Sequence, residues 1–334
     1  MIFDWDQLNT LYSGGDVFLE ALNTCKSDDA IDIPSDLFFN RQYDQDLGKN
    51  ISKNFTLWRA QGQPHVWQIL SLLCDHFSVP ADHKLIVPAM AACVLAEIPN
   101  KNPYHNNDHF FEVVAMSLCL SSAHNDLTRS PAERLSIDEV LLLFIAACIH
   151  DFVHDGRGNI MDGIHIPSRL EKQSLEKSKP YLTKAGLSDD DFAKIEMMVI
   201  ATDVSRNADG RSPAGIARDI YLAHEHDNVS IVNIDDFYAP LVANKNLSLM
   251  SVLLGEADIA MSSGLDYPFS KEMTKLVAQE SSVLQPSVNT LKGFMEVICH
   301  GGYLSRAAQM TLGQSFQAIL LEAQLDGEKG VLYT

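Results

Sequence analysis

The sequence predicts an all-α fold with one main domain, and two observations lead to this class. Most of the chain carries apolar residues at three- and four-residue spacing, which is typical of helices with one buried face. No segment shows sustained two-residue alternation rich in Val, Ile and Thr, and neither a strand–helix–strand rhythm nor an internal repeat is present. Short polar joints are expected at 99–103, 121–132 and 154–163.

Six stretches have the apolar spacing of a helix. They are residues 64–77, 86–97, 137–149, 189–202, 247–263 and 291–325. Ser136 and Glu139 form a capping-box pattern that predicts the start of the third helix. Three aspartates at 189–191 suit the first turn of the fourth, where the helix dipole is positive. The Gly301-Gly302 pair is expected to break the last stretch in two.

The first 50 residues lack a strong pattern. We therefore expect residues 1–50 to form an N-terminal helical extension or subdomain, followed by a main domain over 51–334. A chain of 334 residues suffices for one large helical domain.

Composition and charge exclude several classes of partner. The formal net charge of −19 disfavours nucleic-acid polymers and anionic membranes, because the long-range field repels phosphates. The longest apolar run, 140–149, is shorter than the ~18 residues of a membrane span, and the N-terminus has no signal-peptide pattern. The six cysteines form no CxxC motif and are expected to be buried and reduced. These features predict a cytoplasmic protein.

Two short stretches place histidines four positions apart. In YHNNDHFFEVV, His105 and His109 are expected on one helical face, and in IHDFVHDGRGN the same holds for His150 and His154 if the helix continues. Asp151 follows His150 at the end of an apolar helix, where a buried His-Asp pair is costly unless another group satisfies it. A metal does so, because imidazole and carboxylate suit Zn, Fe or Mn, and aspartate can bridge two ions.

Two more aspartates lie near the ends of apolar helices, Asp203 in MMVIATDVSRN and Asp258 in SVLLGEADIAM. Alone, each such aspartate or histidine is more often a core residue with satisfied hydrogen bonds than a ligand. The set is different, because the chain otherwise keeps its charges on polar stretches. One shared dinuclear metal site explains all of these positions.

Four motifs in this order, YHNNDHFFEVV, HDFVHDGRGN, ATDVSRN and LLGEADIA, resemble those of the class I 3′,5′-cyclic nucleotide phosphodiesterase catalytic domain. That family is a subset of the HD-type metal phosphohydrolases. The resemblance is anchored from Tyr104 to Phe294, a little over half of the chain. It implies a compact multi-helix catalytic domain over 51–334. It also implies a small-molecule substrate, cAMP, cGMP or both, hydrolysed to the 5′-monophosphate.

The resemblance assigns roles residue by residue. The positions that match ligands of a first metal, expected to be zinc, are His109, His150, Asp151 and Asp258. Asp151 would bridge to a second ion, magnesium or manganese, held mostly through water. His105 matches the general acid that protonates the leaving 3′ oxygen, and a hydroxide bridging the two metals is the implied nucleophile. The positions that match holders of metal-bound waters, or of one another, are His154, Asn159, Glu171 and Asp203.

Two divalent ions would also explain how a chain of net charge −19 accepts an anion. His105 needs an orienting partner, which is expected to be a carboxylate on a neighbouring helix.

The predicted substrate pocket departs from the family pattern. Its residues are Tyr104, Met261, Leu291 and Phe294. Leu291 stands where the family usually has a purine-reading Gln, and Met261 where it has an Asn that also faces the base. Base selectivity is therefore expected to be relaxed or unusual, while Phe294 is expected to stack on a ring.

Two other functions stay open from the sequence. One is an HD-type phosphohydrolase acting on another phosphoester through a remodelled pocket. The other is a sensor that binds a nucleotide without hydrolysing it, against which the intact His105 argues, because a sensor does not need the acid. The sequence makes no prediction about oligomeric state.

Overall fold

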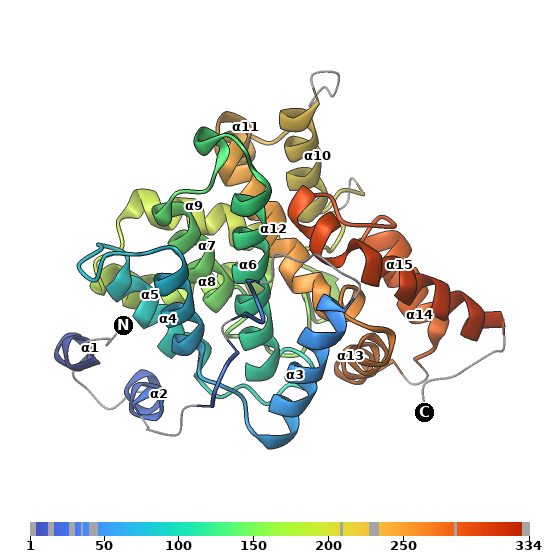
Figure 1. The fold of residues 1–334 in the computed structure, drawn as a ribbon, viewed down its shortest axis with the longest axis horizontal. Helices are drawn as coiled ribbons and strands as arrows, with labels where there is room; N and C mark the ends of the chain where they lie inside the picture. Colours follow the sequence, from blue (N-terminus) through green and yellow to red (C-terminus); the bar gives the residue numbers. More distant parts are fainter. Residues whose placement is uncertain are drawn as a thin grey trace.

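The computed structural model describes residues 5–12, 17–26, 31–34, 36–39, 46–207, 210–226, 234–283 and 286–328. These residues form a bundle in which outer helices surround a central group of helices (Figure 1). The all-α prediction is confirmed.

The helices run in chain order. They are α1 Trp5–Leu11, α2 Val17–Cys25, α3 Leu47–Gln61, α4 Val66–His76, α5 Ile86–Ala96, α6 Asn107–Leu127, α7 Ile137–Ile149, α8 Arg169–Lys184, α9 Asp189–Ile200, α10 Pro213–Glu225, α11 Ala239–Ala243, α12 Lys245–Ser263, α13 Tyr267–Glu280, α14 Val288–Gly293 and α15 Arg306–Glu328. Short 3₁₀ turns lie at η1 Pro131–Glu133 and η2 Asp236–Tyr238, and a π-helical turn, η3, at Phe294–Ile298. Two strands are β1 Ile160–Met161 and β2 Ile164–His165.

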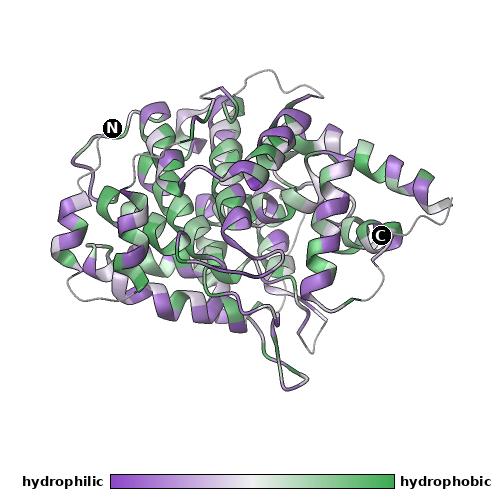
Figure 2. Ribbon diagram, turned by 90° about the horizontal axis from the view of Figure 1, so that it is seen from below, coloured by the Kyte–Doolittle hydropathy of each residue, from purple (hydrophilic) through white to green (hydrophobic). Residues whose placement is uncertain are grey.

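Four helices form the centre of the bundle: α5, α6, α7 and α12. Helices α6 and α12 pack together, and α7 lies against α5, α6 and α9. Every residue of α7 from Val140 to Ile149 is buried, because neighbours cover the helix on all sides. The outer helices carry polar and apolar residues in turn, as expected when one face meets the core (Figure 2).

The predicted helix starts are well supported. Helix α7 begins at Ile137, where Ser136 and Glu139 make the capping box. Helix α9 begins at Asp189, after an N-cap by Ser188. In both cases the first turn carries acidic side chains at the positive end of the helix dipole.

Two segments differ from the prediction. Helix α6 continues through residues 121–127, which were expected to be a polar joint, because Ser121, Ser122 and Ala123 are buried in the core. Strands β1 and β2 form an antiparallel hairpin that the sequence analysis did not predict. Asp162 and Gly163 both adopt positive φ in its tight turn, which suits an Asp-Gly pair.

The last predicted helix is interrupted. It consists of α14, the π-helical turn η3 and α15, and residues 299–305 separate η3 from α15. Gly301 has a φ of +75°, so the expected break near the glycine pair is present.

The described N-terminal residues pack on the same core as the rest. Helix α2 lies against α5, and the ring of Phe18 stacks on Tyr181 of α8 with centroids 4.9 Å apart. Helix α3 spans the predicted boundary at residue 50, and the division of the chain into an extension and a catalytic domain stays a prediction.

Two further expectations concern the cysteines and the absence of membrane-spanning helices. All six cysteines are buried and free of disulfides, as predicted. None of the helices in the described ranges combines the length and the apolar character that crossing a membrane requires.

Candidate active site

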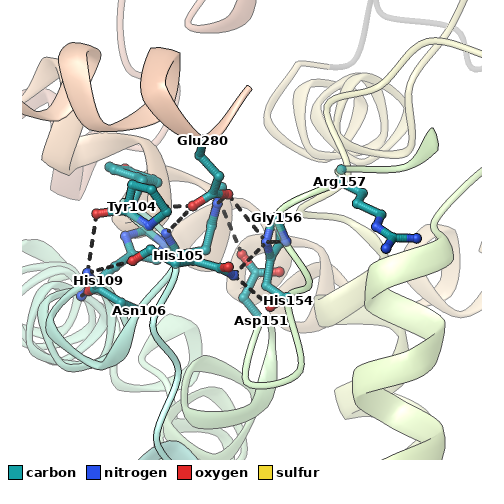
Figure 3. A network of polar contacts seen from close by, with 12 residues as sticks. Tyr104, His105, Asn106, His109, Asp151, His154, Gly156, Arg157 and Glu280 are labelled. Carbon is teal, nitrogen blue, oxygen red and sulfur yellow. Dashed lines mark hydrogen bonds and ion pairs between the residues drawn. The ribbon is translucent and has the colours of Figure 1, made fainter. Parts of the chain in front are cut away.

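Five segments meet at one place near the middle of the bundle. They are the residues that lead into α6, its first turn, the end of α7 with the loop after it, the middle of α12, and the last residue of α13. We call the side chains that meet there the histidine cluster; they are His105, His109, His150, Asp151, His154, Asp258 and Glu280. Figure 3 shows part of this network, with Arg157 lying apart from it.

One part of the histidine cluster has the donors of a metal site. His109, His150 and Asp258 each offer a ligand atom, and these atoms lie within 4.8 Å of one another. Oδ1 of Asp258 is 3.2 Å from Nε2 of His109 and 4.0 Å from Nε2 of His150. Asp151 adjoins them, with Oδ2 3.6 Å from Nε2 of His150. These are the four predicted ligands of the first metal, and the structure brings them together.

Three of the four histidine ring nitrogens in this part lack a hydrogen-bond partner within the described residues. Both ring nitrogens of His109 and Nε2 of His150 are buried without a hydrogen bond. Nδ1 of His150 lies 2.8 Å from the carbonyl oxygen of Ala147, which fixes the ring with Nε2 toward the carboxylates. Burial lowers the pKa of His109, so its imidazole is neutral and free to donate a lone pair. Unpaired buried imidazoles facing carboxylates fit a divalent cation.

The placement of His105 differs from the prediction. It was expected on one helical face with His109, but α6 begins at Asn107 and Asn106 is its N-cap, accepting from the amide of His109 at 3.2 Å. His105 therefore precedes the helix. The bend still brings the two rings together, with centroids 5.2 Å apart and nearly perpendicular planes.

Glu280 is a member of the cluster that the sequence analysis could not name. Its Oε1 lies 2.5 Å from Nδ1 of His105, and its Oε2 accepts from the backbone amides of Tyr104 at 3.0 Å and His105 at 3.1 Å. Burial opposes ionisation, but the bond from His105 outweighs it and lowers the pKa of Glu280 to about 2. An ionised carboxylate thus holds the ring of His105 in place (Figure 3).

His105 belongs to a stacked pair of histidines, and its surroundings favour the protonated form of its ring. Its ring lies over that of His154, with centroids 3.8 Å apart. Burial would lower the pKa of His105, but the bond to Glu280 and the nearby Asp151 raise it above its usual value. Burial and the adjacent His105 lower the pKa of His154 to about 4, so that ring is neutral.

His154 does not reach this position by the predicted route. Helix α7 ends at Ile149, with His150 as its C-cap, and does not continue to His154. A turn closes instead, in which the amide of His154 donates to the carbonyl of Asp151 at 2.8 Å. Gly156, with a φ of +75°, follows and donates to Nδ1 of His154 at 3.1 Å.

The other predicted water-holding residues form an adjoining group. Asn159 donates to Oε2 of Glu171 at 3.2 Å, and Asp203 accepts from the amide of Ser168 at 2.9 Å. Burial, with Asp203 and Asp151 nearby, raises the pKa of Glu171 to about 8. Carboxylates gathered without a neighbouring cation repel one another, so this side of Asp151 also fits a divalent ion.

The chain can be compared with protein-family models, with curated proteins and with solved structures. No protein-family model matches the sequence, and no curated protein matches it. Solved structures do match. The phosphodiesterase domain of the RhoPDE fusion protein from the choanoflagellate Salpingoeca rosetta is 18% identical, with a TM-score of 0.52 over 98% of this chain and 99% of that one.

A second match supports the same assignment. LmjPDEB1, solved in complex with IBMX, is 17% identical, with a TM-score of 0.55 over 95% of this chain and 99% of its own. The chain has the fold of a phosphodiesterase catalytic domain. The predicted architecture is therefore confirmed, and the match extends along nearly the whole of each chain.

The phosphodiesterase fold places the predicted substrate residues in different surroundings. Leu291 and Met261 are fully buried, and Phe294 is partly exposed at the start of η3. The ring of Tyr104 is buried beside His109, with centroids 4.6 Å apart. Their contact with a substrate stays a prediction.

Proposed function

We propose that the chain is a metal-dependent phosphodiesterase that hydrolyses a 3′,5′-cyclic nucleotide, cAMP or cGMP, to the 5′-monophosphate. The observation that carries the proposal is the pairing, in one site, of unpartnered buried imidazoles facing carboxylates with a separately oriented, protonated His105. The phosphodiesterase fold of the solved relatives supports the reaction class.

The proposed ligands of a first divalent ion are His109, His150, Asp151 and Asp258. Asp151 faces both this set and the Glu171 side, which suits a carboxylate shared with a second ion. Zinc suits the first set, which includes two imidazoles, whereas magnesium or manganese suits the oxygen-rich second. When bound, such ions lower the pKa of water and offset the negative charge of a phosphate.

His105 is proposed to donate the proton to the leaving 3′ oxygen. Its Nδ1 is held by Glu280, which leaves Nε2, 3.7 Å from Oδ2 of Asp151, directed toward the proposed metal ligands. The carboxylate of Glu280 keeps the ring both oriented and protonated. This is the arrangement that general acid catalysis at neutral pH requires.

The first test is a hydrolysis assay. Purified protein with Mg²⁺ or Mn²⁺ is incubated with cAMP and with cGMP, and 5′-monophosphate formation is followed beside a metal analysis. Asp151→Ala is the control, since it removes the shared carboxylate. Turnover that the control lacks supports the proposal.

Bound metal without turnover of either nucleotide would exclude the cyclic-nucleotide assignment. It would favour one of the two alternatives, hydrolysis of another phosphoester or binding without hydrolysis. A panel of phosphomonoesters and linear phosphodiesters then separates these two.

A further inference from the structure

A cavity of about 360 Å³ is lined by chain neighbours of Asp203 and Asp258, and its volume lies within the size range of small-molecule sites. The segment 201–219, one face of α12 and residues 297–304 line it. Thr202 directly precedes Asp203 and Ile259 directly follows Asp258, so the Cα atoms of these two lining residues are about 3.8 Å from the Cα atoms of the two aspartates. The described lining residues do not include Leu291 or Met261.

Glu256 of α12 is one of the residues that line this cavity, and one of its two carboxylate oxygens lacks a hydrogen-bond partner within the described residues. The residue is 6% exposed. Its Oε1 accepts from the amide of Leu304 at 2.5 Å and from that of Ser305 at 2.9 Å, at the start of α15. Its Oε2 is buried and has no hydrogen-bond partner within the described residues. A buried acceptor without a partner is costly, and a donor group on a ligand would satisfy it.

Three arginines line the same cavity: Arg206, Arg211 and Arg218. Arg218 of α10 is half-buried and Arg206 is exposed, and within the described ranges neither forms an ion pair. Arg218 lies near enough to Glu256 to oppose the effect of burial, which raises the pKa of that carboxyl. The cavity therefore presents a hydrogen-bond acceptor and guanidinium donors without joining them to each other.

We propose that Glu256 and Arg218 determine base specificity in this cavity and favour guanine over adenine. This inference rests on the proposed function. Guanine carries the donors N1–H and N2–H beside the acceptors O6 and N7, and a guanidinium pairs with O6 and N7 in two parallel bonds. The carboxylate of Glu256 accepts from the donor side. Adenine would instead bring its N6 donor against the guanidinium and its N1 acceptor against the carboxylate.

The apolar residues at the positions where the resembled family usually has base-reading side chains are consistent with this proposal. Leu291 and Met261 have no hydrogen-bonding side-chain groups and are fully buried, so they cannot distinguish purines by polar contacts. Any polar recognition of the base would then come from other residues, and the cavity lined by Ile259, next to Asp258, holds both kinds of group that guanine needs.

The test is the ratio of kcat/KM for cGMP to that for cAMP. The wild-type chain is expected to prefer cGMP, and Glu256→Gln to lower the ratio about 10- to 100-fold, since losing one hydrogen bond to a charged group changes discrimination by about that much. Arg218→Gln is expected to lower it similarly. Glu256→Gln keeps an oxygen for the amides of Leu304 and Ser305, and a thermal unfolding curve checks its fold. Should that variant not fold, Arg218→Gln decides the question.

The matched controls carry the same changes away from the cavity. They are Glu176→Gln, on an exposed glutamate of α8, and Arg157→Gln, on an exposed arginine directed away from the histidine cluster. Neither is expected to change the ratio. A wild-type preference for cAMP, or a ratio unchanged in every folded variant at Glu256 and Arg218, would overturn the inference and leave the proposed function standing.

If the wild-type chain hydrolyses neither nucleotide, the proposed function fails and binding decides the inference. Calorimetric titration of the metal-loaded protein with 5′-GMP and 5′-AMP then supplies the readout. Tighter binding of 5′-GMP that Glu256→Gln weakens at least tenfold would support guanine recognition by this cavity. Equal binding of the two, or no binding, would overturn it.

Discussion

Helix α6 carries two buried ionisable side chains one turn apart, and their surroundings are opposite. Glu112 is 2% exposed and forms two hydrogen bonds with Arg59, from Nε at 2.6 Å and from Nη2 at 2.7 Å. His109 is 0% exposed, and neither of its ring nitrogens has a hydrogen-bond partner in the described part of the chain. The first group is satisfied by the fold, whereas the second is not.

The difference separates a structural ion pair from a binding site. A buried carboxylate with a bidentate arginine needs nothing more from outside the chain. Buried imidazoles that face carboxylates without hydrogen bonds retain capacity for one more partner. The same helix therefore contributes to stability at Glu112 and to the proposed chemistry at His109, and mutations at the two places should have different signatures.

The largest effect is expected on turnover, from a substitution in the histidine cluster. His105→Ala should lower kcat about 10²- to 10⁴-fold, the usual contribution of a general acid, with little change in thermal stability or metal content. Steady-state kinetics, a melting curve and metal analysis are measured on the same preparation. His83→Ala, on a surface pair with Asp138, is the control. Turnover that survives intact in His105→Ala would rule out this acid.

A substitution in the Arg59–Glu112 ion pair should instead lower the stability of the fold. Glu112→Ala leaves Arg59 buried without its partner and is expected to destabilise the fold by about 3–5 kcal/mol. Chemical denaturation measures this. The double variant Arg59→Met/Glu112→Leu should recover most of the loss, because similar apolar side chains can replace a buried ion pair. If the double variant is as unstable as the single one, the pair has another role.

Metal binding provides a third way to distinguish the histidine cluster from the Arg59–Glu112 pair. At a concentration about 100 times the dissociation constant, Mn²⁺ or Zn²⁺ should stabilise the protein by about 3 kcal/mol, and a chelator should reverse this. The effect should disappear in Asp258→Ala and persist in Arg59→Met/Glu112→Leu. An equal stabilisation of both variants would place the ion outside the histidine cluster.

The smallest effect is expected at the positioning residue. Glu280→Gln keeps the shape of the side chain but removes the charge that orients and protonates His105. Loss of such an outer partner typically costs about 10- to 100-fold, so kcat should fall by that factor while KM changes little. Matched rises in KM without a change in kcat would show that Glu280 affects substrate binding rather than the acid.

Local signals in the sequence were enough for most of the fold. Apolar spacing predicted α4, α5, α7, α9 and α12 to within a few residues. It failed where burial is unusual for polar residues: Ser121 and Ser122 in α6 are covered by tertiary neighbours, which the composition of the segment cannot show.

Most side chains that meet in the histidine cluster were singled out by the sequence, whereas the geometry of the cluster was not predicted. His105 and His154 both reach the cluster from outside a helix, and the sequence contained signals for this. Asn106 is a favoured N-cap residue, and Gly156 lies where the chain needs a positive φ after α7. Glu280 had no such signal, because it is 175 positions from His105 and only tertiary packing brings it there.

The π-helical turn at Phe294–Ile298 has a consequence for how this protein can diverge. A π turn contains one residue more than an α turn would. Deleting a single residue there would restore α geometry and rotate the neighbouring side chains by about 100°, one residue's share of a helical turn. Val297 and Ile298 belong to the cavity wall, so one deletion would give that wall new side chains without touching the histidine cluster. If the cavity and the histidine cluster have the proposed roles, substrate range and catalysis could evolve on separate parts of the chain.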